Sequence, residues 1–503
     1  MATAAPVAPQ DRPRIVVTTD LEVDDMNSLV HLALYLNDLD LAAITTTASQ
    51  YHFQGDGTHT LGEVNPHWRT SGRLAYQMGR KGHGPDPDAG TLAEYRPFPQ
   101  TWLEDLWAGP YAQAWPSLEA NAPGYPTPEE LLARTYHGNE AFEGDVREDT
   151  PGSDAVKAAI MDDDPRTLWL LSWGGMNTIV RALMSIAADW QGTPRWDQVR
   201  EKVYRKVRVL GVYNGVGQDN SWADHGRELF PELALLRPSA MFQSYFSAVR
   251  DQADCLPMFQ APWPQQNLIE GNGDLMGLYR LYADGHHLEG EPERYQYCEH
   301  GVLDFGFGEG VRHRFNAGDL LGEGDSMTFV PLVPMGLRGA GEKGFETPLG
   351  VLYEDGAEPP AFVGNPFAGD LGAFNPCLKP LWEEFAARAA WCSHEPAQCI
   401  HPPVVELTCA GDVMAAPGES VALAATAADP DGRELLTLWE YDQLVSSYAG
   451  TRPVRPWDPV GATTAVTIPA DAKPGDRLVF TFVARNVADH PISRYAQVAV
   501  TVR

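Results

Sequence analysis

The sequence predicts an α/β domain with a mostly parallel β-sheet flanked by helices, followed by an all-β domain. Over the first 400 residues, runs rich in β-branched residues alternate with segments of helical periodicity, as in βαβ units. After residue 400, apolar and polar residues alternate between closely spaced turn signals. We therefore expect a flexible lead at 1–12, an α/β domain at 13–400 and a β-sandwich at 401–503.

The first βαβ unit is expected within the first fifty residues. Residues 14–20 form an apolar, β-branched run that is typical of a buried strand. Residues 24–37 place apolar side chains at helical spacing, and their leading acidic residues suit the helix dipole. Residues 39–47 predict a second strand. Because such crossovers are right-handed, the two strands are expected to be parallel.

The same alternation returns later in the chain. Residues 167–173 predict a strand, the pair Gly174-Gly175 predicts a turn, and residues 177–190 predict a helix. Residues 206–213 predict another strand that ends in polar and glycine residues. Ligands of such open sheets bind beyond the carboxyl ends of the strands. The polar residues just after each strand are therefore the first candidates for a site.

The last hundred residues differ in pattern from the rest. Strict alternation at 420–426, 477–484 and 496–502 predicts a sandwich of the immunoglobulin-like kind. Within it, the Asp-Pro-Asp-Gly sequence at 429–432 is open to two interpretations, a tight turn or a second calcium site. Elsewhere, the weakly periodic residues 50–150 and 255–350 are expected to form loops and short helices.

The charge balance excludes some partners. The chain has 68 acidic against 37 basic residues, a formal net charge of −31. Such a surface repels phosphate backbones and anionic lipids, so we expect no nucleic-acid or membrane partner. No apolar run is long enough to span a bilayer. Neutral sugars and cations fit this surface better.

The cysteines and the first residues bear on localisation. Six cysteines occur, and no pair has the close spacing of a zinc site. One or two disulfides and free buried thiols are both open. The small-residue and proline start is similar to what remains after a signal peptide is removed, which favours a secreted or periplasmic protein.

Four carboxylates crowd into six residues at the first strand-to-helix junction: Asp20, Glu22, Asp24 and Asp25. So many like charges favour a hard divalent cation with oxygen ligands. An EF-hand does not fit, because Asp25 stands where glycine is needed and His31 where glutamate is needed. The alternative is a helix start decorated with acids. The threonine run and the strand before it favour the metal interpretation.

Residues 18–25 resemble the Asp-x-Asp-Pro-Gly-x-Asp-Asp signature of nucleoside hydrolases. They are closer still to relatives described as cellulose-binding proteins with a nucleoside hydrolase-like domain. Asp20, Asp24 and Asp25 match the later three aspartates, and Thr18 replaces the first. The resemblance implies that Asp20 is the general base at a calcium-bound water and a metal ligand. It implies that Asp24 holds a sugar hydroxyl and that Asp25 binds Ca²⁺.

Later segments extend this resemblance. Residues 44–50 resemble the second-strand motif, which makes Gln50 a sugar ligand with His52 nearby. The turn at 173–178 resembles the one whose backbone carbonyl binds calcium, here that of Asn177. The segment containing Glu323 and Asp325 resembles the one that supplies the last calcium aspartate, which is Asp325. The likeness to the cellulose-binding relatives covers nearly the whole chain, and that to true nucleoside hydrolases covers the sheet only.

The sugar and base ligands of nucleoside hydrolases are not recognisable here. Asn214, Asp219 and Asn220 follow the matching strand and are the candidates to replace them. Trp173 is a candidate for stacking on a sugar, with core packing as the alternative. For the general acid that a poorer leaving group needs, Glu323 and His52 are candidates, and ordinary hydrogen bonding is the alternative for each.

The function expected from the sequence is a calcium-dependent glycoside hydrolase acting on a furanoside or related carbohydrate. Genuine nucleoside hydrolysis is one alternative, and carbohydrate binding without turnover, as in cellulose binding, is another. The expected partner is a carbohydrate, and a homo-oligomer is left open. The substrate, the general acid and the role of the β domain stay open on the sequence alone.

Overall fold

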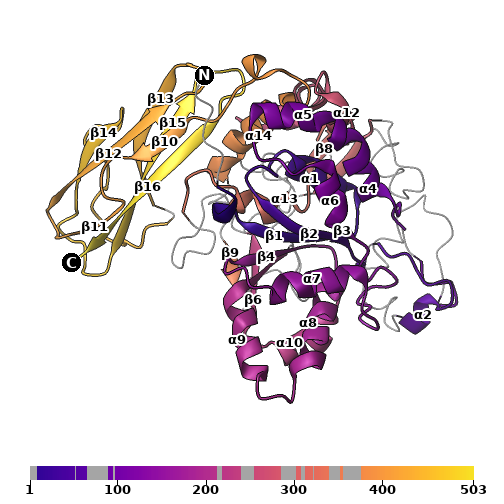
Figure 1. The fold of residues 1–503 in the computed structure, drawn as a ribbon. Helices are drawn as coiled ribbons and strands as arrows, with labels where there is room; N and C mark the ends of the chain where they lie inside the picture. Colours follow the sequence, from indigo (N-terminus) through magenta and orange to yellow (C-terminus); the bar gives the residue numbers. More distant parts are fainter. Residues whose placement is uncertain are drawn as a thin grey trace.

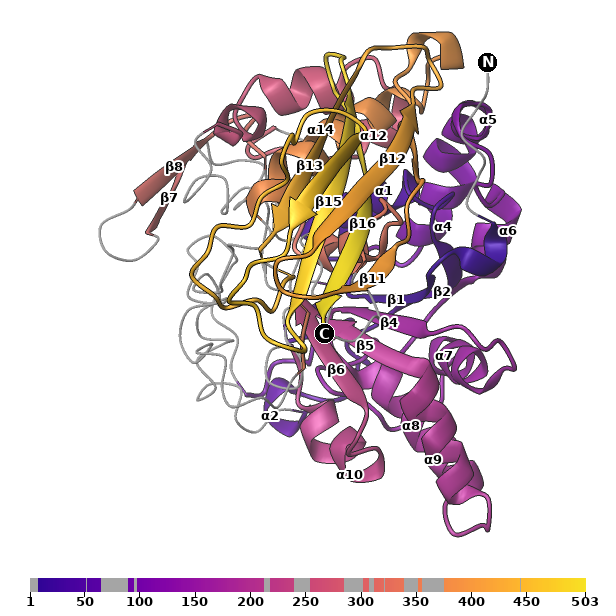
Figure 2. The same cartoon turned by 90° about the vertical axis from the view of Figure 1, so that its left-hand side faces the viewer.

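The computed structural model shows a three-layer α/β domain joined to a two-sheet β domain (Figures 1 and 2). The predicted fold class, an α/β domain with a mostly parallel sheet followed by a β-sandwich, is confirmed. The structure describes residues 8–50, 52–64, 89–94, 97–211, 218–238, 254–284, 302–306, 312–320, 322–338, 352–354, 375–443 and 445–503.

The central sheet has seven strands in the order β3-β2-β1-β4-β5-β6-β9. All neighbours are parallel except β6 and β9. The chain builds outward from β1 through β2 to β3 and then restarts beside β1 with β4, so the strand order reverses between β1 and β4. The bounds are β1 Arg14–Thr19, β2 Asp40–Thr46, β3 Thr135–Tyr136, β4 Leu168–Trp173, β5 Val207–Gly211, β6 Ala234–Pro238 and β9 Leu352–Glu354.

Strand β1 is apolar on both faces because helices cover the sheet on both sides. Ile15 and Val17 point into one hydrophobic core and Val16 into the other. Figure 1 shows the two helical layers above and below the sheet. The first layer includes α1 Val23–Ala33, α4 Trp102–Leu106, α5 Ala112–Asn121, α6 Pro128–Ala133, α12 Gly273–Gly277, α13 Ser326–Phe329 and α14 Asn375–Ala390; the second has α7 Pro151–Met161, α8 Asn177–Trp190, α9 Trp196–Lys206 and α10 Arg227–Leu229.

Local signals explain where several helices begin and end. Helix α7 starts with a capping box, in which Thr150 and Ser153 satisfy each other's backbone N–H groups. The helix predicted at 24–37 ends at Ala33 and is followed by turns. The strand predicted from 206 begins at Val207, because Lys206 still belongs to α9. The remaining short elements are η1 Pro9–Asp11, α2 Leu61–Val64, η2 Trp107–Tyr111, η3 Trp222–Gly226, η4 Leu256–Phe259, η5 Gln265–Ile269, β7 Val302–Gly306, β8 Arg312–Asn316, η7 Val330–Leu332 and η8 Pro396–Gln398.

The C-terminal strands form two sheets with one core between them. One sheet has the order β10-β12-β14 and the other β11-β16-β15-β13, with β11 parallel to β16. Alternation along the strands sends side chains such as Leu423, Trp439 and Phe480 into the core. The bounds are β10 Val404–Leu407, β11 Asp412–Ala415, β12 Ser420–Ala428, β13 Leu435–Asp442, β14 Thr463–Thr467, β15 Arg477–Asn486 and β16 Ser493–Val502.

The sandwich is docked on the α/β domain through α14. Arg494 of β16 forms two hydrogen bonds with the buried carboxylate of Glu384, at 2.8 and 2.9 Å. Arg388 donates to the same carboxylate at 3.0 Å and pairs with Asp38 at 2.6 Å. The N–H of Tyr495 also donates to the carbonyl of Met335 at 3.0 Å. The four-stranded sheet is therefore the one that faces the α/β domain.

Three further expectations concern a turn, the cysteines and membrane-spanning helices. Residues 429–432 form a tight turn, in which the N–H of Gly432 donates to the carbonyl of Asp429 at 3.1 Å. Cys392, Cys399 and Cys409 are free thiols, Cys255 is buried, and the side chains of Cys298 and Cys377 lie outside the described residues. Among the helices of the described segments, none has the length and apolar character needed to cross a membrane.

Candidate active site and metal centre

The reversal of strand order between β1 and β4 places several loops at one edge of the sheet. Asp20 directly follows β1, and Gly174 directly follows β4. A Cβ on Gly174 would lie only 3.0 Å from the Cβ of Asp20, so the two strand ends are in close contact. Such a switch point is where open α/β sheets bind their ligands. The site predicted from the sequence lies at this edge.

The turn between β1 and α1 is held by Thr19. Its hydroxyl accepts from the N–H of Leu21 at 3.0 Å and donates to Oδ1 of Asp25 at 2.6 Å. Leu21 has φ of 53°, a left-handed conformation that a β-carbon disfavours. The fully buried Leu21 side chain offsets part of that cost. This sharp turn directs Asp20 and Asp25 toward the same region.

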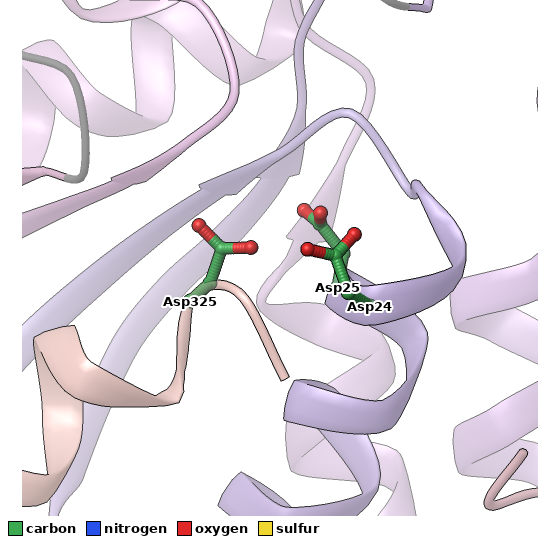
Figure 3. A group of neighbouring side chains, drawn as sticks. All are labelled: Asp24, Asp25 and Asp325. Atoms are coloured by element: carbon green, nitrogen blue, oxygen red, sulfur yellow. The ribbon is translucent and has the colours of Figure 1, made fainter. Parts of the chain in front are cut away.

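Three carboxylates meet at the start of α1. Asp24 and Asp25 come from the helix, and Asp325 comes from the loop before α13 (Figure 3). One oxygen of each lies within 4.8 Å of the others, and Asp25 and Asp325 are buried. Burial and the charges of Asp325 and Asp20 raise the pKa of Asp25 well above its usual value. Burial and the charge of Asp24 do the same to the pKa of Asp325.

Helix α1 holds the distant loop that carries Asp325. Asn27 donates to the carbonyls of Arg280 and Gly322 at 3.0 and 3.1 Å, and Ser28 accepts from the N–H of Asp325 at 3.4 Å. One turn further along, His31 contacts Glu323 at 2.7 Å. These positions share one side of α1 because helical neighbours recur every three to four residues. The face that meets the loop is therefore polar although it is buried.

Glu323 lies in this tether and is fully engaged. Its Oε2 contacts Nδ1 of His31 and accepts from the hydroxyl of Ser326 at 2.6 Å. Its Oε1 accepts a very short hydrogen bond from the hydroxyl of Tyr279. The predicted candidate acid thus sits two residues before Asp325 with both oxygens occupied. This arrangement is suited to positioning the loop.

Gly324 lets the loop approach the helix closely. A Cβ at this position would lie 2.1 Å from Oδ2 of Asp24. That distance is far inside van der Waals contact, so any larger residue would displace the carboxylate of Asp24. The loop therefore brings Asp325 to the cluster and also packs against Asp24.

Asp20 occupies the centre of the switch point. It is 1% exposed, and its Oδ2 has no hydrogen-bond partner among the described residues. Burial is the largest influence on its pKa and raises it to about 6, with a further rise from Glu22 and an opposing effect from His52. The side chain of Ser49 is a hydrogen-bond partner. A buried carboxylate with a free oxygen is suited to accept a proton.

His52 and Gln50 line the same edge after β2, and both are buried. Nε2 of His52 lies 3.8 Å from Oε1 of Glu22, the residue that precedes α1. The N–H of Gln50 donates to the carbonyl of Gln218 at 2.7 Å. His52 and Glu22 therefore both lie close enough to influence Asp20, and Gln50 follows the neighbouring strand at the same edge.

Asn177 and Asp219 form a separate polar group at the start of α8. Asp219 accepts from the N–H of Asn177 at 2.9 Å and caps the helix. The amide of Asn177 donates to the carbonyl of Asn139 at 2.6 Å and accepts from the hydroxyl of Thr47. Its carbonyl lies within the first helical turn. These bonds tie Asn177 to Thr47, Asn139 and Asp219, with none to the three aspartates.

The other predicted substrate residues are placed as follows. Trp173 is fully buried in the core, and its Nε1 donates to the hydroxyl of Thr328 at 2.6 Å. The side chain of Asn220 is exposed. Asn214 lies outside the described residues. The structure therefore gathers Asp20, Asp24, Asp25, Asp325, His52 and Gln50 at one edge, with Glu323 behind them.

Sequence reasoning missed the residues that organise this edge. Ser49 is a hydrogen-bond partner of Asp20, and Asn27 and Ser28 hold the loop of Asp325. The one available signal was that Asn27, Ser28 and His31 interrupt an otherwise apolar helix. Polar residues on a buried helix face need partners.

The fold and this site define a nucleoside hydrolase-like α/β protein. Residues 14–347 match the model of the family described as Cellulose-binding Sde182, nucleoside hydrolase-like domain. The chain belongs to this family, as its resemblance at 18–25 and the later motifs indicated.

One solved structure shares the fold of this chain. One similar structure is of a nucleoside hydrolase-related hypothetical protein from Saccharophagus degradans that is associated with carbohydrate metabolism. It shares 21% identity over 98% of this chain and 100% of that chain, with a TM-score of 0.67, which shows a common fold. A plant nucleoside hydrolase covers 74% of this chain and 98% of its own at 12% identity, with a TM-score of only 0.26. No curated protein matches the chain.

Proposed function

We propose that this protein is a calcium-dependent glycoside hydrolase that acts on a furanoside or related carbohydrate. The observation that carries the proposal is Asp20, a buried carboxylate with a free oxygen beside a cluster of three more. Surplus negative charge buried at one point is costly unless a cation or a proton compensates it. This arrangement supports a role in binding a cation or in transferring a proton.

The donor set fits a hard divalent cation. Asp24, Asp25 and Asp325 supply only oxygen ligands, and burial together with the neighbouring carboxylates raises the pKa values of Asp25 and Asp325, the mark of an uncompensated cluster. We assign these three residues as the ligands. When bound, Ca²⁺ would neutralise them and make a water at the site more acidic. We thereby propose Asp24 as a metal ligand, whereas the sequence predicted it as a sugar ligand. We do not include Asn177 among the proposed metal ligands.

The side chains divide the chemistry as follows. Asp20 takes a proton from the water that attacks the anomeric carbon, while the bond from that carbon to the leaving oxygen breaks. The leaving oxygen then needs a proton. Of the two candidates for this role, Glu323 has both oxygens occupied, so we assign the role to His52. Nε2 of His52 lies 3.8 Å from Oε1 of Glu22. Gln50 stands beside them as a hydrogen-bonding partner for the sugar.

Carbohydrate binding without turnover is the second candidate. The family description itself contains the words cellulose-binding, and the hydrogen bonds of Glu323 remove one of the two acids expected from the sequence. A binding protein would have no use for a buried base, and this favours the hydrolase. Either function places the protein among carbohydrates, and a secreted or periplasmic location follows from that substrate.

Hydrolysis of nitrophenyl furanosides, with calcium or with a chelator, tests the proposal. We expect release of nitrophenol that needs calcium and falls about 1,000-fold in Asp20→Asn, as for loss of a general base. Asp163→Asn, at a fully exposed position, is the matched control and should retain full activity. Inosine and uridine in parallel reveal a nucleoside hydrolase. If no furanoside or nucleoside is hydrolysed while glycans bind, the binding function replaces ours.

A further inference from the structure

The sandwich has one covered face and one free face. The four-stranded sheet meets the α/β domain through Tyr495, Gln497 and Arg494. The three-stranded sheet β10-β12-β14 is the other sheet of the sandwich, and Figure 1 shows β12 and β14 on the side away from the α/β domain. Its outer surface is therefore directed away from the rest of the protein.

The part of the free face over β12 and β14 carries hydroxyl and methyl groups. Leu423 and Val466 point into the core, so their neighbours along the strands point outward. On β12 these outward residues are Ser420, Ala422 and Thr426, and on β14 they are Thr463, Ala465 and Thr467. On β10 the outward residues are Val404 and Glu406, so Glu406 is the one long side chain among these three strands, and the part of the face over β12 and β14 leaves room for a ligand.

One large aromatic residue stands at the edge of this face. Trp457 is 68% exposed, and it is the only aromatic among the exposed large hydrophobic residues of the described segments. Its N–H donates to the carbonyl of Ala465 at 2.9 Å, and its Nε1 donates to the hydroxyl of Thr467 at 3.1 Å. The indole is thus fixed beside β14 with its polar atom already used. The part of Trp457 that is exposed to solvent is therefore its apolar ring.

The surroundings of Trp457 decide which partner fits. A net charge of −31 disfavours polyanions. Protein interfaces bury several large apolar side chains together, whereas Val404, on β10, is the only exposed large hydrophobic residue on the described strands of this sheet. A row of hydroxyls next to one fixed ring suits a sugar polymer, because the C–H face of a sugar stacks on an indole while its hydroxyls bond to Ser420, Thr426 and Thr463.

We propose that the free face of the β10-β12-β14 sheet is a binding platform for a neutral polysaccharide, with Trp457 as its stacking residue. The inference rests on the proposed carbohydrate function for its class of ligand. It assigns to the sandwich the task of holding polymer, at a site separate from the aspartate cluster. The switch-point site and the platform lie on different domains, so each can be disabled alone.

Retention of the full chain by microcrystalline cellulose, xylan and starch granules tests the platform. We expect one of these polymers to retain the wild type and to hold Trp457→Ala at least fivefold more weakly, while Trp457→Phe keeps part of the affinity. Met414→Ala is the matched control, since Met414 is 62% exposed on the other sheet of the same domain. Equal melting temperatures exclude misfolding as the cause.

Two outcomes would overturn the platform. One is retention of Trp457→Ala equal to that of the wild type, or no retention of either. The other is a wild type that dimerises in sedimentation while Trp457→Ala is monomeric and no polymer is retained, since Trp457 would then join two copies. Asp20→Asn should bind polymer like the wild type. Failure of hydrolysis with Trp457-dependent retention therefore rejects only the hydrolase.

Discussion

At the scale of single residues, the site is defined by how few partners its acids have. Asp20 keeps a buried oxygen free, and Asp25 and Asp325 face each other with raised pKa values. Glu323 is as buried as they are, yet three donors satisfy it. This contrast separates the acids proposed for chemistry from the acid that holds the loop.

Asp325→Asn should separate metal binding from folding. In the metal-free protein it removes one of several buried like charges, so we expect a melting temperature equal to or above that of the wild type. Calcium at 100 times its dissociation constant should stabilise the wild type by about 2.7 kcal/mol. The variant should lose this gain, with roughly 100-fold weaker binding. Calorimetric titration and melting curves measure both, and an unchanged calcium response would remove Asp325 from the ligand set.

Gly324→Ala tests the close approach of the loop to Asp24. Its new methyl group would lie 2.1 Å from Oδ2 of Asp24 and must push that carboxylate aside. We expect calcium affinity to fall about 10-fold. Gly277→Ala is the control, because a Cβ there meets nothing within 4 Å. Equal affinities in the two variants would show that Asp24 is no ligand.

The division of roles between Asp24 and Asp25 could not be read from the sequence. The two residues are adjacent, and a match to a signature assigns them by order alone. Their relation to the cluster depends on Gly324 and Asp325, which lie some 300 positions away. The motif located the site at the end of β1, and only the folded chain shows which oxygens meet.

At the scale of elements, α1 does two tasks. Its apolar residues, such as Leu29 and Val30, pack in the core. Its polar face, formed by Asn27, Ser28 and His31, contacts the segments around Asp325. The proposed metal centre thus lies where a helix contacts a loop. Its geometry depends on residues that touch no ligand.

Glu323→Gln tests this dependence. The amide keeps one acceptor but presents an NH₂ group to donors, so part of the tether is lost. We expect calcium affinity to fall about 10-fold and the free energy of unfolding to drop by about 1–3 kcal/mol. Calcium titration and denaturant unfolding give these values. If Glu323 were instead the general acid, the alkaline limb of the pH–rate profile would vanish with calcium affinity unchanged.

The elements that sequence periodicity predicted are those with a clean pattern. β1, β4 and α8 have unbroken apolar runs or stripes, and α8 was predicted with its observed bounds. Helix α14 was not predicted, because Pro380 interrupts it and its buried face includes Glu384 and Arg388. Those charges are buried only because the sandwich and α1 approach from elsewhere.

At the scale of the whole molecule, α14 joins the domains by buried charge. Burial alone would raise the pKa of Glu384, but Arg494 and Arg388 outweigh this and lower it to about 2, from an ordinary value of 4.5. Arg494 belongs to the sandwich and Arg388 to α14. The docking of the two domains is therefore linked to the ionised state of one carboxylate.

Acid should weaken that docking within a defined range. Because the folded pKa of Glu384 lies below the unfolded value, its contribution is complete above about pH 4.5 and is lost as pH falls toward 2. The difference corresponds to about 3 kcal/mol. Denaturant unfolding of wild type and Glu384→Gln should therefore differ most at neutral pH and converge near pH 2. A difference independent of pH would contradict the assignment.

The length of chain between Ser28 and Asp325 has a consequence during synthesis. The two residues are in contact yet 297 positions apart. A ribosome that adds 5 to 20 residues per second needs roughly 15 to 60 s to make that stretch. Throughout this interval Asn27 and His31 lack their partners Gly322 and Glu323, which have not yet been synthesised. The proposed metal site can therefore be complete only after Asp325 has been added to the chain.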